Sequence, residues 1–297
     1  MTRKWAKLAA ACTLWFAASA PAALAGSVTQ PGETVGLATG APLPEGVYFV
    51  NTGDWGCRDT SPERTCVGVD IPVVAWSTPW KFLNARVQFL VATPVLEVGV
   101  HRTTHLASVY NPLIAGQLAW DLGNGFSFSY LAGAYFDVHG ELAWSSTSFN
   151  QRFALSYTGN DWIISANVIW GIHFDSVTDR PQISPCPAPL ALNGCNPDFI
   201  NVDVTVVKKF GRWQLGPVAF GSTDLNRPVA GYLKQSQIAV GGLVGYDFGP
   251  LTLQTYVTTD VHEQNYGGRD TRVWGRLIVP VWAPPAAPPA RPLITKG

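Results

Sequence analysis

The chain has 297 residues, of which 47% are apolar and only 13% are charged, and it carries 12 Trp, 14 Phe and 9 Tyr. So many aromatic residues exclude a disordered chain, and the lack of a short repeat excludes a collagen-like or coiled-coil rod. Because 20 basic residues balance 20 acidic ones, no electrostatic argument favours nucleic acid as a partner.

Residues 1–25 have the features of a signal peptide. Three basic residues precede an apolar stretch from Leu8 to Ala20, and Ala-Leu-Ala at positions 23–25 forms a small-x-small cleavage site. The apolar stretch is shorter than the roughly 20 residues that a membrane-spanning helix needs, so we expect cleavage rather than retention. A lipoprotein would carry a cysteine just after the cleavage region, where this chain has Ser27. The sequence therefore predicts an exported chain without a lipid anchor.

Two further segments fall outside any predicted domain. Residues 26–43 are rich in Gly, Pro, Ser and Thr and are too short to form a domain, so we expect a periplasmic N-terminal segment. Residues 283–297 hold five prolines among alanines and cannot pair as a β-strand. We expect them to form a disordered periplasmic tail.

Between residues 44 and 282, apolar and polar residues alternate with a period of two in about twelve segments. In the clearest of these, Trp162–Phe174, large apolar residues occupy every second position, and Ser165 and Asn167 lie between them. A period of two is typical of β-strands with one apolar and one polar face. The predicted fold class is therefore all-β.

The connections between these segments are alternately short and long. A short one is Gly123–Gly125, whereas Gly53–Cys66, His101–Asn111 and Asp175–Asp198 are long and polar. In a transmembrane β-barrel the short turns face the periplasm and the long loops face the outside. The alternation predicts a closed antiparallel transmembrane β-barrel of about 12 strands over residues 44–282, in contact with outer-membrane lipid.

The aromatic residues form two bands in this arrangement. Trp80, Trp162 and Trp213 lie beside short turns, and Trp144 and Trp170 lie toward the long-loop ends. Indole and phenol rings gather at both interfaces of a membrane, which explains two bands. The alternative is that the same residues form the core of a secreted soluble β-sandwich, such as a lectin.

Four cysteines follow the signal peptide, in two pairs of nine-residue separation. Local pairing, Cys57–Cys66 and Cys186–Cys195, needs the least chain closure and suits an oxidising compartment. Zinc ligation is the alternative, but the chain has no C-x-x-C motif and no histidine near either pair. We expect two loop disulfides.

The inward faces of the strands would line the barrel lumen. The predicted lumen-lining residues are Arg86, Gln88, Asn150, Arg152, Asp203, Gln237, Asp247, Gln254, Arg272, Arg276, Trp274, Tyr135 and Tyr256. Arg152, Arg272 and Arg276 would favour anions or carboxylated aromatic molecules, unless they pair with Asp residues and fill the barrel. Trp76 would join the aromatic members of the set as a stacking surface for apolar solutes.

Nothing in the sequence indicates catalysis. A barrel phospholipase would need a serine near a histidine, but none of the five histidines has a serine at His-x-Ser spacing, and no Gly-x-Ser-x-Gly motif occurs. The histidines lie toward the long-loop ends, where imidazole could bind a metal or titrate, but amphipathic imidazoles also suit a membrane interface. We expect no enzymatic activity, no cofactor and no metal site.

Several diffuse motifs resemble a bacterial outer-membrane family, the phenol meta-cleavage-pathway proteins. They are Pro44–Tyr48, Asn160–Trp162, Gln237–Asp247 and Pro280–Trp282. The resemblance implies a twelve-stranded barrel that transports small hydrophobic or aromatic compounds and is related to the secretion channel for functional amyloid. Two departures stand out: a Pro-rich tail follows the closing aromatic residue, and residues 26–43 show no counterpart of the amyloid channel's periplasmic plug.

The sequence thus predicts a channel in the outer membrane of a Gram-negative bacterium, inserted by the barrel assembly machinery. It would allow passive passage of small hydrophobic or aromatic molecules and require no cofactor. Whether copies associate into a homo-oligomer is left open. The main alternative is a structural or adhesive barrel with a closed lumen and disulfide-braced surface loops.

Overall fold

The computed structural model describes residues 27–59, 64–100, 104–140, 142–143, 146–174, 197–228 and 232–285. Its strands are β1 (Gly46–Arg58), β2 (Thr65–Phe82), β3 (Ala85–Ala92), β4 (Val95–Val100), β5 (Thr104–Val109), β6 (Leu113–Gly123), β7 (Phe126–Tyr135), β8 (Ser148–Tyr157), β9 (Trp162–His173), β10 (Phe199–Phe210), β11 (Trp213–Asp224), β12 (Ser236–Asp247), β13 (Thr252–Gln264) and β14 (Asp270–Trp282). Within the described ranges, no helix has the length and hydropathy to span a membrane. The predicted signal peptide and most of the predicted tail lie outside these ranges.

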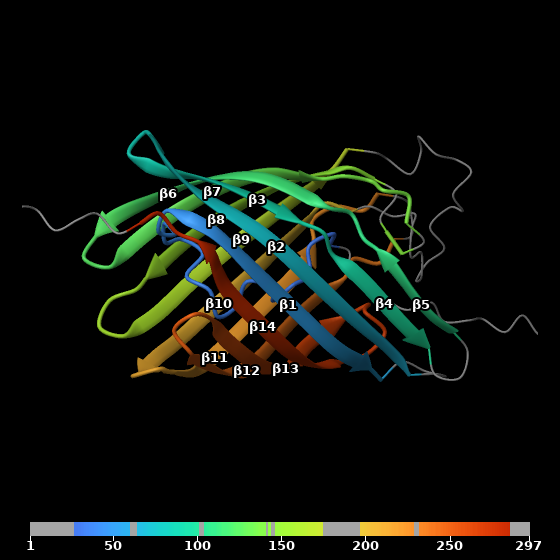
Figure 1. Ribbon diagram of the computed structural model, residues 1–297. Coiled ribbons are helices and arrows are strands. Elements are labelled where there is room, and N and C mark those ends of the chain that lie inside the picture. Colours follow the sequence, from blue (N-terminus) through green and yellow to red (C-terminus); the bar gives the residue numbers. More distant parts are fainter. Residues whose placement is uncertain are drawn as a thin grey trace, which may run out of the picture.

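Twelve of the strands form one closed barrel (Figure 1). Each strand from β6 to β14 pairs with the next one along the chain, β6 pairs with β3, β3 pairs with β2, and β1 joins β2 to β14. Every pairing is antiparallel, so the backbone hydrogen bonds run around the whole circumference and no barrel edge is left open. The predicted closed antiparallel barrel of twelve strands is confirmed.

The two remaining strands form a hairpin at the long-loop end. The first part of β2, as far as Asp70, pairs with β4, and the later part, from Val73, pairs with β3. Pro94 separates β3 from β4, because proline has no N–H for a ladder hydrogen bond, and its carbonyl accepts one from the N–H of Tyr110 (2.8 Å). A long polar loop was expected over His101–Asn111, but β5 occupies much of that range.

The alternation of residues along each strand produces an apolar outside and a mixed inside. On β9, Ser165 and Asn167 are buried, whereas Ile164 and Trp170 are exposed. Large apolar side chains are likewise exposed along the middle of other strands, for example Val74, Phe89, Ile114, Phe153, Leu155, Val240, Val257 and Val273. An apolar outer belt over a polar and aromatic interior is the pattern of a barrel that contacts lipid.

Exposed aromatic side chains gather beside the short turns. Trp213 packs against Tyr246 with ring centroids 4.8 Å apart, and Tyr246 packs against Phe248 at 4.7 Å. Trp76 belongs to this outer surface, because it is 38% exposed and packs against Trp80 at 5.3 Å. The expectation that Trp76 lines the lumen is therefore wrong: the inward positions of β2 fall on its neighbours, such as Ser77.

The segment that precedes β1 lies inside the barrel. A periplasmic segment was expected, but residues 27–43 are hydrogen-bonded to inward-facing side chains of the strands (Figure 1). A twelve-stranded barrel is wider than its own side chains can fill, so a further piece of chain completes the interior. We call residues 27–43 the luminal segment.

The luminal segment folds as a series of tight turns. Backbone hydrogen bonds link Glu33 to Gln30, Val35 to Gly32 and Leu37 to Thr34. Gly32 has a φ of 89°, and a Cβ atom there would lie 2.6 Å from the ring of Phe220. Glycine is therefore required at this position both for its backbone conformation and for the close approach to the β11 wall.

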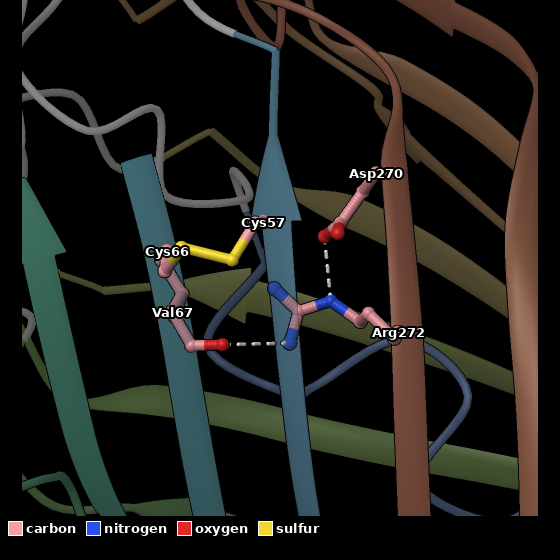
Figure 2. Close-up of a disulfide and its surroundings, with 5 residues drawn as sticks. All are labelled: Cys57, Cys66, Val67, Asp270 and Arg272. Carbon is pink, nitrogen blue, oxygen red and sulfur yellow. Dashed lines mark hydrogen bonds and ion pairs between the residues drawn. A yellow bond between two sulfur atoms is a disulfide. The ribbon is translucent and has the colours of Figure 1, made fainter. Parts of the chain in front are cut away.

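A disulfide joins β1 to β2 at the long-loop end of the barrel (Figure 2). Cys57 and Cys66 are directly opposite each other in the β1–β2 ladder, with Cα atoms 4.0 Å apart. This predicted disulfide is confirmed, and the second one, Cys186–Cys195, lies outside the described residues.

Candidate functional site in the barrel lumen

Asp203 on β10 is the main anion that holds the luminal segment. One carboxylate oxygen accepts a hydrogen bond from the backbone N–H of Gly32 (2.9 Å). The other accepts from the backbone N–H and the hydroxyl of Thr34 (2.9 and 2.6 Å). Asn167 on β9 adds a hydrogen bond from its amide to the same hydroxyl (3.0 Å). A buried carboxylate with three donors is well compensated for its lost hydration.

Arg276 on β14 is the corresponding cation. Its guanidinium donates to the backbone carbonyls of Glu33 and Val35, and also to Gln254 Oε1 (3.0 Å) and the Tyr256 hydroxyl (3.1 Å). A planar guanidinium carries five N–H donors, so one side chain can bind two backbone carbonyls and two side chains together. Arg276 therefore fixes the segment to the wall formed by β13 and β14.

A third attachment is an ion pair between the segment and β8. Arg152 Nη1 lies 2.7 Å from the Glu33 carboxylate. The other guanidinium nitrogens donate to Asn150 Oδ1 (3.0 Å) and to the Tyr135 hydroxyl (3.1 Å). Every nitrogen of this guanidinium thus has a partner.

Arg272 and Arg58 form a separate buried network near the disulfide. Arg272 pairs with Asp54, and its Nε donates to Asp270 (2.6 Å), as Figure 2 shows for the second contact. Arg58 lies 3.6 Å from Asp260 and 3.7 Å from Asp270. The expected positive lining is therefore not what these arginines form. Arg272 pairs with Asp residues, as the alternative expected, Arg152 pairs with Glu33, and Arg276 donates to carbonyl, amide and hydroxyl oxygens.

Most of the predicted lining residues are buried and contact the luminal segment or one another. Those buried inside the barrel are Gln88, Tyr135, Asn150, Arg152, Asp203, Gln237, Gln254, Tyr256, Arg272, Trp274 and Arg276. The other two lie at the short-turn ends of their strands: Arg86 is partly exposed and donates to the backbone carbonyl of Thr78, and Asp247 is exposed and accepts the N–H of Gly249. Sequence alternation gave no sign that the luminal segment packs against the inner set.

Two of the three inner aromatic residues of this set, Tyr256 and Trp274, pack in the same buried cluster as Val35 of the segment. Tyr256 and Trp274 stack with centroids 5.0 Å apart and an interplanar angle of 12°. Phe220 meets Trp274 edge-on at 6.1 Å, and Val35 of the segment belongs to the same buried cluster. Their role here is core packing around the segment.

A cavity of about 400 Å³ separates the luminal segment from the wall formed by β1, β2, β3, β6 and β7. Its lining is largely apolar: Leu37, Ala38, Ala41, Pro42 and Leu43 from the segment face Val50, Ile71, Val73, Ala75, Leu90, Ala92, Leu113 and Leu131 from the strands. The polar lining includes Glu33, Gln88, Gln117, Ser129, Tyr135 and Arg152. We call this space the inner cavity.

A second, smaller cavity of about 50 Å³ lies toward the long-loop end, beside Arg58, Gln237 and Arg272. Both cavities are lined by Glu33, Ile71 and Tyr135, which therefore stand between them. A layer of side chains that includes these three residues therefore lies between the two cavities.

Sequence reasoning missed the segment's contact residues. Gly32, Glu33 and Thr34 lie in a stretch whose composition is that of a linker. One available signal was the four-residue spacing of Gly32, Gly36 and Gly40, since each approaches a strand too closely for a side chain. Composition alone cannot distinguish a solvated linker from a coil packed inside a barrel.

The rim histidines do not converge. His105 pairs with Glu97, His139 Nδ1 lies 3.5 Å from Asp137, and His173 Nδ1 lies 2.7 Å from the Ser146 hydroxyl. Within the described part of the chain, no group of three or more His, Cys, Asp or Glu side chains could hold a metal ion.

Comparison with known proteins places this fold among outer-membrane barrels. The family described as "Putative MetA-pathway of phenol degradation" matches residues 43–277. Among solved structures, the chain is similar to the COG4313 outer membrane channel from Pseudomonas putida F1, with a TM-score of 0.65 and 10% identity over 84% of this chain and 99% of that chain. None of the curated proteins matches.

The chain is also similar to two autotransporter domains, at lower TM-scores. The translocator domain of NalP from Neisseria meningitidis gives 0.44, with 9% identity over 80% of this chain and 89% of that one. The β domain of BrkA from Bordetella gives 0.46, with 10% identity over 78% and 98%. At such identities the likeness to the COG4313 channel establishes the fold alone, which is that of an outer-membrane β-barrel.

Proposed function

The chain belongs to the family of the MetA pathway of phenol degradation, and on that premise we propose that it is an outer-membrane channel for passive passage of small hydrophobic or aromatic molecules. On this proposal the luminal segment closes the channel, because it lies inside the barrel and is hydrogen-bonded to its strands. Insertion by the barrel assembly machinery and contact with outer-membrane lipid form part of the proposal.

The observation that carries this function is the inner cavity. A volume of about 400 Å³ is within the usual range for small-molecule sites, and an apolar lining with few polar groups is typical of them. Apolar walls on both sides would let a hydrophobic solute leave water without losing hydrogen bonds. A polar solute would find little compensation there.

Passage requires the luminal segment to move. Glu33, Tyr135 and Ile71 line both the inner cavity and the smaller one, so a solute that passes from one cavity to the other must displace them. The half of the segment that lines the cavity, from Leu37 to Leu43, has fewer side-chain hydrogen bonds than the half around Gly32 and Thr34. We infer that this cavity-lining half moves first.

A cavity-filling substitution tests the proposal. Ala75 is buried, points into the inner cavity and has exposed Val74 as its neighbour on the same strand. In proteoliposomes, Ala75→Phe should reduce entry of a neutral aromatic probe at least about fivefold, because the new ring occupies the route. The matched variant, Val74→Phe, places the same ring on the lipid side and should leave entry unchanged. Equal entry through both variants would overturn the proposed route.

A structural or adhesive barrel with a closed lumen is the second candidate. It is favoured by one observation: the luminal segment is hydrogen-bonded to β8, β9, β10, β13 and β14. For this candidate, neither wild type nor any cavity variant would admit the probe above the rate of protein-free liposomes.

A further inference from the structure

We propose that Glu33 determines the charge selectivity of the inner cavity, by occupying Arg152 so that the cavity accepts uncharged ligands and rejects carboxylates. This inference rests on the proposed function, since it names the ligand class of the same site. It differs from the expectation that Arg152, Arg272 and Arg276 would make the lumen favour anions.

The first step of the argument is that every nitrogen of Arg152 already has a partner. It is the cation that lines the inner cavity, and its guanidinium is shared among Glu33, Asn150 and Tyr135. A carboxylate ligand that approached Arg152 would have to displace the Glu33 carboxylate, which already lies 2.7 Å away. An incoming anion would therefore meet a negative group where the sequence suggests a positive one.

The second step is that Glu33 is held in position. Its backbone carbonyl accepts from Arg276, and the neighbouring N–H groups of Gly32 and Thr34 donate to Asp203. The residues on both sides of Glu33 are thus fixed to strands on the far wall of the barrel. The backbone that carries the Glu33 carboxylate is therefore held in place beside Arg152.

The third step is that the other polar groups of the cavity are already engaged with one another. Gln117 donates to Gln88 Oε1 (3.1 Å), Gln88 donates to the Ser77 hydroxyl (3.3 Å), and Ser129 donates to the backbone carbonyl of Thr39 (2.9 Å). A carboxylate that entered would lose its hydration and meet donors that already have partners, which is costly in an apolar space. A neutral aromatic molecule does not incur this cost.

Removal of the Glu33 charge should reverse the selectivity. In Glu33→Gln, Arg152 keeps its position through Asn150 and Tyr135 but loses its anion. The new amide oxygen is a neutral acceptor, which a carboxylate ligand can displace more easily than it can displace the Glu33 carboxylate. The probes are 2-naphthol, which is uncharged at neutral pH, and 2-naphthoate, which has the same ring system and a carboxylate. Binding to the full-length purified barrel in detergent is measured by calorimetry.

Wild type should bind 2-naphthol and show little or no binding of 2-naphthoate. Glu33→Gln should gain at least about tenfold in affinity for 2-naphthoate, because a charge-assisted pair with Arg152 becomes available. The double variant Glu33→Gln/Arg152→Gln should lose that gain. Glu45→Gln removes a carboxylate just beyond the segment and serves as the charge control, with wild-type preference expected.

Two results would overturn the inference: tighter binding of 2-naphthoate than of 2-naphthol by wild type, or no gain in Glu33→Gln. If Glu33→Gln released the whole segment, the affinity for both probes would rise alike. The Asp203→Asn variant, in which we expect the segment to be released, shows what that outcome looks like. Because binding is measured without a membrane, a failure of the selectivity inference is distinguishable from a failure of the proposed channel function. Wild-type selectivity could hold in a barrel that transports nothing, and transport could occur without this selectivity.

Discussion

At the scale of single residues, the interior is organised by buried charges that bind backbone rather than solvent. Asp203 accepts three hydrogen bonds from two residues of the luminal segment, and Arg276 donates to two of its carbonyls. The strand that carries each of these side chains is far from the segment in sequence. The segment is therefore held by tertiary contacts, and no conformational preference of its own residues would place it there.

Asp203→Asn should release the segment. The amide replaces one accepting oxygen by an NH₂ group that faces N–H donors, so at least one buried donor loses its partner and the ionic character is lost, at a cost of about 2–3 kcal/mol. Hydrogen exchange should show loss of protection for the amides of Gly32 and Thr34. The β10 and β11 amides should remain protected, and unchanged protection of the segment would contradict this account.

For each of these contacts, the sequence pattern indicates the side of the strand residue but not its partner in the luminal segment. Alternation along the strands placed Asp203, Arg152 and Arg276 inside, because a period of two leaves only two faces to choose from. Their partners, such as Glu33, lie in a coil, where no periodicity assigns a side. The pairing that neutralises Arg152 could not be deduced from the composition of the lining.

At the scale of elements, each strand combines an inward face that meets the segment with an outward face that meets lipid. Val257 lies near the middle of β13 and is exposed, whereas Val281 is exposed at the short-turn end of β14. Both strands lie in one wall and pair with each other. They offer two outward positions that differ in membrane depth.

An arginine at these positions should be tolerated unequally. Val257→Arg should lower the free energy of unfolding in lipid by about 2–4 kcal/mol, and Val281→Arg by no more than about 1 kcal/mol, because the cost of a charge falls toward the interface. Denaturant unfolding in liposomes measures both variants. Equal effects, or a larger effect at Val281, would mean that the apolar belt is not where lipid contacts the barrel.

Element prediction succeeded where the turns are short. Asn84, Asn124 and Asn160 have positive φ angles in the turns that close adjacent strands, and such residues are recognisable turn formers. It failed at β5, which was expected to be a polar loop but pairs with β4 in the hairpin that follows Pro94. A proline marks an interruption, but it does not show whether pairing resumes afterwards.

At the scale of the whole molecule, the barrel wall and the lumen contents have different origins. Closure follows from twelve alternating segments joined by short and long connections, and it was predictable because each segment repeats the same pattern. The filling of the lumen depends on one segment that occurs once and has no repeat. Global shape could therefore be predicted more securely than the open or closed condition of the channel.

The central claim is that the luminal segment closes the lumen and must move before solutes pass. The Thr39 hydroxyl lies 3.1 Å from that of Ser165 on β9, so a disulfide in Thr39→Cys/Ser165→Cys would tether the segment to the wall. Wild type treated with the same reductant controls for the Cys57–Cys66 disulfide.

The decisive measurement is single-channel conductance of this variant in a planar bilayer, recorded before and after reductant is added to the same membrane. The account predicts no current steps while the tether is intact and discrete steps once it is reduced. Steps of the same size and frequency under both conditions would contradict it.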